Sequence, residues 1–153
     1  MLSQLFQWSP FPGSINVMTD RLTPQRRSWN MSRVRAANTK PELVVRSLIH
    51  KMGYRYRLHV RELPGCPDIV LPRLKCVVFV HGCFWHRHRS CPFAYSPKTR
   101  KAFWQNKFKG NVARDRKQLR TLADLGWRVL VVWECELRNL DSIAKRLKSF
   151  LSS

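Results

Sequence analysis

Hydrophobic residues recur along the chain with two different periods, and these periods predict the secondary structure. The sequence TKPE at 39–42 has the form of a helix capping box with proline in the first turn, and apolar residues follow at helical spacing as far as Gly53. The next stretch, YRYRLHV at 54–60, alternates bulky and polar residues. This alternation predicts a half-buried strand directly after the first helix.

Further apolar segments predict the centre of a sheet. Strands are expected over 68–71, 75–80 and 127–134. The segment 75–80 is almost wholly apolar, which is typical of a central strand covered on both faces, and WRVLVVWE at 127–134 is expected to be buried as well.

Helical periodicity predicts two more helices in the second half of the chain. One opens at Ser96-Pro97 and is capped by Gly126, with Gly110 as a point of interruption, and the other covers 140–151. The whole order is a helix, three strands, a helix, a strand and a helix. Such an order predicts an α/β fold in which a mixed sheet lies between layers of helices.

The net charge of the chain limits the classes of molecule that it is expected to bind. Lys and Arg number 29 against 9 Asp and Glu, giving a formal net charge of +20, and 153 residues suffice for one hydrophobic core. Because self-repulsion of so many cations opposes compaction, a polyanion is the expected partner. Nucleic acid is favoured over a membrane, since no apolar run reaches the roughly 18 residues of a spanning helix.

The N-terminal part differs from the rest in composition. Residues 1–17 carry no basic residue and are expected to be a disordered leader, whereas 18–153 are expected to form a single domain. The basic segment 19–38 is either a solvated tail or an arm that lies on DNA, with Trp29 or Met31 available to wedge between bases. The chain has five cysteines, an odd number, and no secretory signal, which favours reduced thiols in a cytoplasmic compartment.

Two acidic residues have positions that suggest chemistry. Asp68 opens one strand and Val80-His81 ends the next, so a short hairpin would bring the carboxylate close to the Val80 carbonyl and could seat a hard divalent cation. The alternative is a structural Pro-Asp turn. Asp115 interrupts the inward stripe of the long helix, where an ionised carboxylate needs a partner. A histidine from another element would serve, unless Asp115 lies at the surface.

The segment VFVHGCFWHRHRSC at 78–91 combines metal-ligand and aromatic side chains. Two cysteines and one histidine from this segment, with Cys135 from a distant strand end, could close a tetrahedral zinc site, although the spacing does not decide between His86 and His88. Buried, unreactive cysteines are the alternative, and Cys76 fits that description better. Aromatic side chains beside basic ones stack on distorted bases or fill the core.

Four segments together resemble a known family: LPGCPD, VFVHGCFWHRHRSC, FWQNKFKGNVARD and GWRVLVVWECE are similar, in order and spacing, to the very short patch repair endonucleases. The resemblance runs from about residue 18 to the C-terminus. It implies a restriction-endonuclease-like α/β/α sandwich with a central mixed sheet and a structural zinc site. It also implies an enzyme that nicks DNA 5′ to the thymine of T:G mismatches left by deamination of 5-methylcytosine.

The resemblance implies catalytic and metal-binding roles for individual residues. Asp68 and the Val80 carbonyl would hold magnesium, while His81 and His86 would contact its waters and the scissile phosphate. Asp115 would support His86. Zinc would be bound by Cys83, His88, Cys91 and Cys135.

The resemblance also implies contacts with DNA. An aromatic wedge beside the mismatch would consist of Phe84, Trp85 and Trp104. Asn30 and Met31 in the basic arm would enter the minor groove, and Glu42 would be a neighbour of the active site.

The sequence departs from the wider superfamily because Phe79-Val80-His81 stands where Glu-x-Lys is usual, so histidines must replace the lysine. Cys66 receives no role.

Two rival functions stay open at this point. A related endonuclease could cleave matched duplex sites beside a methyltransferase, and a zinc-stabilised DNA-binding module could lack catalysis. The expected partner is double-stranded DNA with a T:G mismatch, followed by mismatch-repair proteins and a repair polymerase. A monomer in the bacterial cytoplasm, associated with the nucleoid and not with a membrane, is expected.

Overall fold

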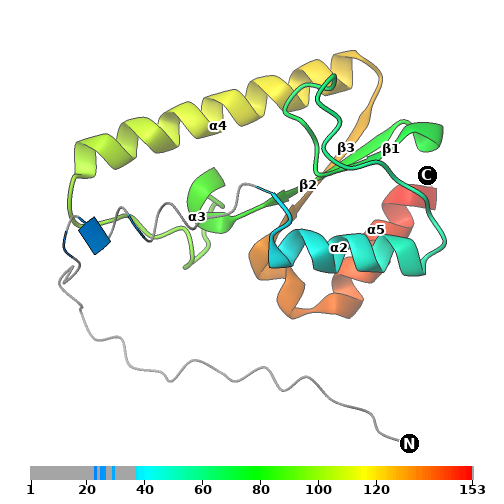
Figure 1. Ribbon diagram of the computed structural model, residues 1–153, viewed down its shortest axis with the longest axis horizontal. Helices are drawn as coiled ribbons and strands as arrows, with labels where there is room; N and C mark the ends of the chain where they lie inside the picture. Colours follow the sequence, from blue (N-terminus) through cyan, green and yellow to red (C-terminus); the bar gives the residue numbers. More distant parts are fainter. Residues whose placement is uncertain (1–22, 24, 27–28, 30–36, 153) are drawn as a thin grey trace, which may run out of the picture.

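The computed structural model describes residues 23, 25–26, 29 and 37–152 (Figure 1). The predicted DNA-binding residues Asn30 and Met31, and most of the predicted basic arm, lie outside these residues. In chain order the elements are α2 (Lys40–Lys51), β1 (Ile69–Leu71), η1 (Pro72–Leu74), β2 (Cys76–His81), α3 (Cys83–His86), α4 (Lys101–Asp124), β3 (Arg128–Trp133), η2 (Glu134–Arg138) and α5 (Leu140–Ser152).

The sheet is mixed, as predicted, and β2 is its central strand. In the described residues the order is β1-β2-β3, with β1 antiparallel and β3 parallel to β2. The parallel register pairs Val78 with Leu130 and His81 with Trp133. Because β2 and β3 run in the same direction, their carboxyl ends meet at one edge of the sheet.

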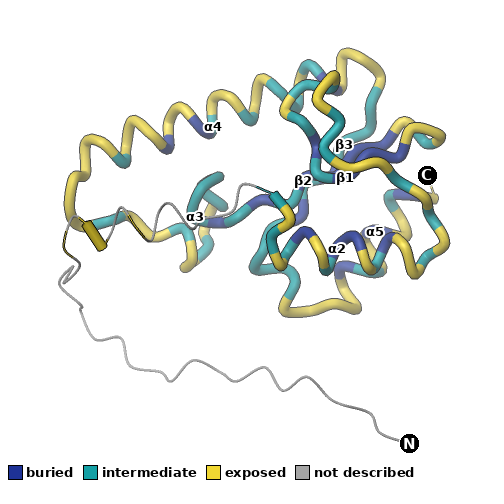
Figure 2. The backbone as a smooth tube through the Cα atoms, in the orientation of Figure 1, coloured by how far each residue is buried: buried dark blue, intermediate teal, exposed yellow. Residues whose placement is uncertain are grey.

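Helices cover both faces of this sheet. On one face α2 and α5 pack their apolar residues, such as Ile49 and Leu147, against Val78 and Val132. On the other face Leu122 of α4 packs against neighbouring strand positions such as Val77. Figures 1 and 2 show α4 on one side of the strands, the α2 and α5 pair on the other, and the buried segments concentrated between them. The predicted three-layer α/β/α architecture is therefore present.

The first helix begins as its sequence predicts. The Thr39 hydroxyl and the Glu42 side chain form a reciprocal capping box, and Pro41 stands in the first turn. The later helix α4 runs without a break through Gly110 and ends before Gly126, which has a positive φ of 77°. The expected interruption at Gly110 is wrong.

One predicted strand and the start of one predicted helix are also wrong. The segment 54–60 forms a single bridge, in which the backbones of Arg57 and Val70 exchange two hydrogen bonds of 2.8 Å, rather than a strand. His59 has a φ of 47°, which turns the backbone out of the extended conformation. The long helix begins at Lys101 rather than at Ser96, because Arg100 before it has a φ of 51° and does not continue a right-handed helix.

Within the described residues, no helix is both long enough and apolar enough to cross a membrane.

Candidate active site and metal centres

An open cleft of about 1000 Å³ lies around the end of β2. Its walls come from the start of α2, the segment before β1, the end of β2, α3 and one side of α4. Seven acidic and imidazole side chains line the cleft: Glu42, His59, Asp68, His81, His86, Asp115 and Glu134. The cleft therefore collects all four residues predicted to be catalytic, and Glu42 as well.

Asp68 lies at the entrance to β1 and its carboxylate faces β2. The backbone N–H of Val80 donates a hydrogen bond of 2.7 Å to Asp68 Oδ2. The antiparallel register pairs Ile69 with Val78, and continued two residues further it would bring Pro67, which has no N–H to donate, opposite Val80. Burial raises the pKa of Asp68, and the neighbouring Glu42 carboxylate adds to the rise although the Val80 hydrogen bond opposes it. A cation beside Asp68 would relieve this cost.

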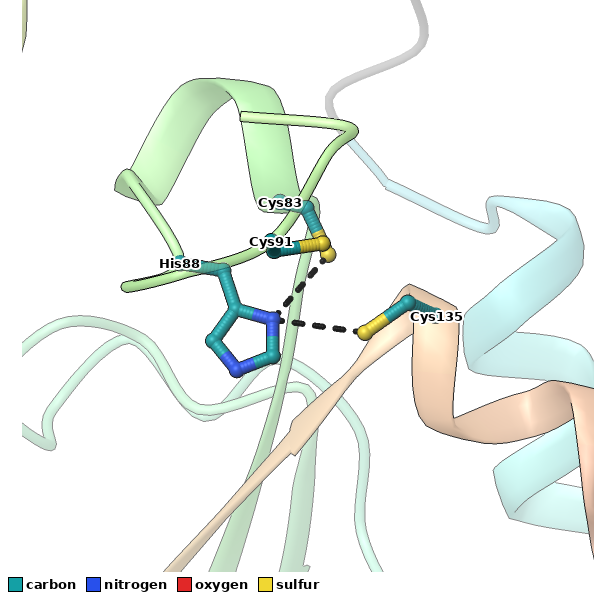
Figure 3. A group of neighbouring side chains, drawn as sticks. All are labelled: Cys83, His88, Cys91 and Cys135. Atoms are coloured by element: carbon teal, nitrogen blue, oxygen red, sulfur yellow. Dashed lines mark hydrogen bonds between the residues drawn. The ribbon is translucent and has the colours of Figure 1, made fainter. Parts of the chain in front are cut away.

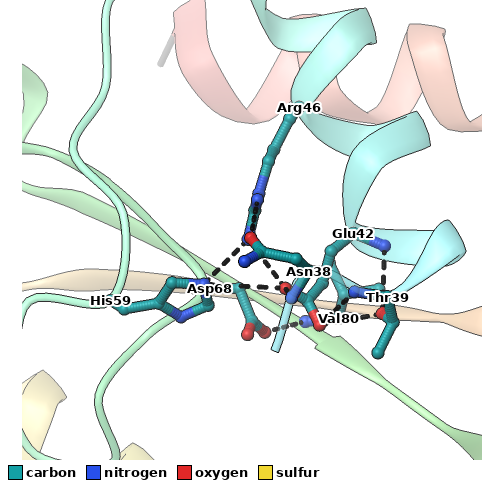
Figure 4. A network of polar contacts seen from close by, with 7 residues as sticks. All are labelled: Asn38, Thr39, Glu42, Arg46, His59, Asp68 and Val80. Atoms are coloured by element: carbon teal, nitrogen blue, oxygen red, sulfur yellow. Dashed lines mark hydrogen bonds and ion pairs between the residues drawn. The ribbon is translucent and has the colours of Figure 1, made fainter. Parts of the chain in front are cut away.

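Glu42 is held by several donors at the start of α2 (Figure 4). Its carboxylate accepts hydrogen bonds from the Asn38 backbone at 2.9 Å, the Thr39 hydroxyl at 2.8 Å and the buried Arg46 guanidinium at 2.7 Å. Arg46 Nη2 also lies 2.9 Å from His59 Nε2. Because a guanidinium only donates, His59 accepts through Nε2. Glu42, His59 and Asp68, named here the Asp68 group, place one donor atom each within 4.8 Å of one another.

A second group that lines the cleft consists of His81, His86 and Asp115. His86 Nδ1 lies 2.6 Å from Asp115 Oδ2, so the partner expected for the inward-facing acid of α4 is the histidine of α3. The carboxylate can only accept, and Nδ1 therefore carries the proton while Nε2 is left for chemistry in the cleft. The rings of His81 and His86 stack with centroids 3.8 Å apart and planes within 10°.

The two stacked histidines differ in their environment. His81 is buried, and this burial, with a further contribution from His86, lowers the pKa of His81 to about 4. Its imidazole is therefore neutral at physiological pH. Within the part of the chain that the structure describes, His86 alone of the two has a carboxylate within hydrogen-bond distance, and its side chain is 26% exposed. His86 is thus the better placed of the two to exchange protons with a bound molecule.

Three cysteine thiols and one histidine imidazole, all possible metal ligands, come together beside the cleft and form the Cys/His cluster (Figure 3). His88 Nδ1 lies 3.5 Å from Cys83 Sγ and 3.3 Å from Cys135 Sγ, and one donor atom from each member lies within 4.8 Å of all the others. Ligand atoms around a tetrahedral zinc ion with bonds of about 2.0–2.3 Å are separated by about 3.3–3.8 Å. The donor set therefore fits zinc in chemistry and in spacing. Its members are Cys83, His88, Cys91 and Cys135.

Two polar residues that the sequence analysis missed hold α3 in place. Glu134 Oε1 accepts a hydrogen bond of 2.9 Å from the backbone N–H of Cys83. Asn111, buried in α4, donates through Nδ2 to the Trp85 carbonyl at 3.0 Å. Both are single side chains whose partners lie far away in the sequence, so local spacing gave no signal for them. Arg46 gave one signal, its position four residues after Glu42 on the same helix.

An aromatic cluster adjoins the cleft on the side of α3 and α4. The Phe84 ring lies 5.0 Å from Trp85, 5.4 Å from Trp104 and 5.2 Å from Phe108. Phe84, Trp85 and Trp104 are partly exposed, and Trp85 also lines the cleft. The three residues predicted as a wedge therefore lie together and beside the acidic and imidazole groups. Cys66, which received no role, lines the cleft too and has a φ of 49°.

Comparison with known proteins shows the family to which the chain belongs. The family model described as DNA mismatch endonuclease Vsr matches residues 19–92. The chain is 42% identical over 126 residues to the DNA mismatch endonuclease Vsr of Escherichia coli K12, covering 82% of this chain and 80% of that protein. It belongs to the Vsr family. Another relative, the type II nicking enzyme V.XorIIP of Xanthomonas oryzae pv. oryzae, is 52% identical, covering 88% of this chain and 98% of that protein.

A solved structure supports the fold of this Vsr-family chain. The catalytic domain of the homing endonuclease I-Bth0305I superposes with a TM-score of 0.51 at 23% identity, covering 74% of this chain and 94% of that domain. The similarity is consistent with the restriction-endonuclease-like α/β fold that the sequence predicts. Together with the Vsr relatives, it supports a DNA endonuclease.

Proposed function

We propose that the protein is a magnesium-dependent endonuclease that nicks DNA 5′ to the thymine of T:G mismatches, in very short patch repair. The observation that carries the proposal is the convergence on one cleft of Asp68 with the His86 and Asp115 pair, beside the aromatic cluster. Vsr-family membership supports the same reading.

Asp68 is proposed as the carboxylate ligand of magnesium, with the Val80 carbonyl beside it. In an extended strand the N–H and C=O of one residue point to the same edge, and the Val80 N–H points to Asp68. One carboxylate and one carbonyl suffice for this ion, which keeps several waters. When bound, it would supply positive charge to stabilise the negative charge that develops on the phosphate.

His86 is proposed as the proton-transferring residue. Its Nδ1 is bonded to Asp115, so Nε2 can accept a proton from the water that attacks the phosphorus in line. Asp115 then stabilises the imidazolium that forms. His81, neutral and stacked on His86, would orient that ring and contact the scissile phosphate or its waters.

The Cys/His cluster is proposed as a structural zinc site. All four positions are filled by protein side chains, as in zinc sites that fold a loop rather than catalyse. Burial raises the pKa of the Cys83 and Cys135 thiols, so the ion would displace protons that these thiols otherwise keep. In this arrangement zinc would fix the loop that carries the aromatic and imidazole residues of α3.

Specificity is proposed to come from the aromatic cluster and the basic walls of the cleft. Lys107 and Arg114 of α4 line the cleft and suit the sugar-phosphate backbone. Trp85 and its aromatic neighbours would insert beside the mismatch, because a wobble pair is easier to unstack than a matched pair.

The direct test is a nicking assay on one duplex prepared with a T:G, T:A or C:G pair at the same site. The expected result is a single nick 5′ to the mismatched thymine, dependent on added magnesium, with the matched duplexes nicked at least about a hundredfold more slowly. Equal rates on all three duplexes would replace the repair function with a restriction-type function on matched sites. Binding without any nick would favour a DNA-binding module.

A further inference from the structure

A continuous series of rings joins the Cys/His cluster to the proposed proton-transferring pair. His88 stacks on Trp133 with centroids 4.2 Å apart and planes within 6°. Trp133 meets His81 edge-on at 5.3 Å, and His81 stacks on His86 at 3.8 Å. Trp133 is thus the one member of this series that belongs neither to the Cys/His cluster nor to the histidine and aspartate group.

The backbone explains why Trp133 occupies this position. It is the last residue of β3 and the register partner of His81, so the two side chains leave the sheet side by side. Two residues later, Cys135 contributes its sulfur to the Cys/His cluster. Between them, Glu134 accepts the Cys83 N–H and thereby ties the end of β3 to the start of α3.

We propose that Trp133 is a positioning residue for the cleavage reaction, through which the Cys/His cluster fixes the ring orientations of His81 and His86. This inference rests on the proposed function, since it assumes that His86 moves the proton. The imidazole torsion is broad and roughly two-fold, so ring neighbours must restrict it, and Trp133 meets the His81 ring edge-on in addition to the contacts from Phe79 and His86. A proton-transferring ring must be held within a fraction of an ångström of its productive position.

The cluster then has two effects that can be separated. It stabilises the loop around α3 through its metal ligands, and it orients the catalytic rings through the stack of His88 on Trp133. A variant that keeps the ligands but loses the stack would separate these effects. His88→Cys does so, because four cysteines also form a structural zinc site while the ring that covers Trp133 is removed.

The test compares Trp133→Leu, Trp133→Phe and His88→Cys with the control Trp127→Leu. Trp127 immediately precedes β3 and packs against the α4 side of the sheet, away from the Cys/His cluster. Zinc content is measured by mass spectrometry. The kcat and KM values are measured on T:G duplex in single-nick assays, and the ring signals of His81 and His86 are recorded by ¹⁵N-resolved NMR.

The expected result is one zinc per chain in every variant and an unchanged KM. In Trp133→Leu and His88→Cys, kcat falls about tenfold to a hundredfold and the ring signals of His81 and His86 shift or broaden. Trp133→Phe recovers most of kcat, and Trp127→Leu changes neither kcat nor the ring signals.

The proposal is overturned if zinc-loaded His88→Cys and Trp133→Leu keep wild-type kcat and ring signals, or if Trp127→Leu loses as much kcat. It is also overturned if Trp133→Phe loses its zinc, because Trp133 would then act on the cluster itself. Should wild type fail to nick T:G duplex, the proposed function fails, whereas the ring signals still decide whether Trp133 and His88 orient the two histidines.

Discussion

The Cys/His cluster and the cleft adjoin the same strand ends, yet their donor atoms are of different kinds. The cluster offers three sulfurs and one imidazole nitrogen, whereas the cleft offers carboxylate oxygens and imidazoles. Soft thiolates select zinc, and carboxylate and carbonyl oxygens suit magnesium. The end of β2 contributes to both sites, because Val80 and His81 line the cleft and Cys83 follows two residues later.

Under the proposed function, this difference in donor atoms would let a short chain hold two metals close together without exchanging them. Donor chemistry would assign each ion to its own site, and the two sites could then act separately. Loss of the Cys/His cluster should damage folding and, with it, every activity. Loss of the metal site at Asp68 should remove cleavage and leave the fold, the zinc and the binding of DNA intact.

The largest effect is expected from removing a soft ligand. Cys135→Ser should lose the zinc and lower the free energy of unfolding by several kcal/mol, because binding energy of a structural zinc is also folding energy. Cys66→Ser is the matched control: this cysteine lines the cleft outside the Cys/His cluster and should keep full zinc content. Metal analysis and thermal unfolding measure both. A zinc-loaded, stable Cys135→Ser would contradict the separation of the two sites.

Removing the hard ligand should leave the fold unharmed. Asp68→Asn keeps an oxygen that can accept the Val80 N–H, but it loses the charge that holds a cation. Cleavage of T:G duplex should fall by about a thousandfold or more, equivalent to about 4 kcal/mol in the barrier. Zinc content, DNA affinity and unfolding temperature should stay within error or rise slightly, since burial penalises the Asp68 charge. Exposed Asp124→Asn is the control, and a comparable loss there would show that the effect is not local.

A smaller effect is expected where the aromatic cluster meets the cleft. Trp85→Leu should weaken binding to T:G duplex by about 1–3 kcal/mol, the range found for stacking of a base on an aromatic side chain. Binding to matched duplex should change less, so the preference for the mismatch should shrink. Phe93→Leu, an exposed aromatic residue that stacks with Arg138, serves as control. Equal losses on both duplexes would assign Trp85 to packing rather than to mismatch recognition.

The smallest effect concerns pH. His81 has a pKa of about 4 in the folded protein, below its ordinary value of 6.5. Below about pH 6.5 the unfolded chain therefore binds a proton that the folded chain refuses, and stability falls as the pH drops toward 4. Between pH 7.5 and pH 6 this contribution is about 0.8 kcal/mol. Urea unfolding of wild type and His81→Phe at both pH values isolates it, and identical pH dependences would show that His81 is not buried as a neutral ring.

Local sequence signals predicted the features that depend on neighbours in the chain. The capping box at Thr39, the apolar strands and the inward position of Asp115 each follow from spacing, and the histidine partner of Asp115 follows from the cost of a buried charge. The contacts of Arg46 with His59, and of Trp133 with His88, depend on which distant segments meet in the fold. Spacing contains no such information. The strand expected over 54–60 failed for a related reason, since alternation does not reveal the left-handed backbone of His59.

The division of metals between the two sites can be measured directly. Crystals of the protein with a T:G duplex, soaked in Mn²⁺ as a substitute for magnesium, would be exposed to X-rays above and below the zinc absorption edge. The expected result is a zinc peak enclosed by Cys83, His88, Cys91 and Cys135, and a separate manganese peak in contact with Asp68 and the phosphate. Zinc at Asp68, manganese among the cysteines, or no metal beside Asp68 would contradict it.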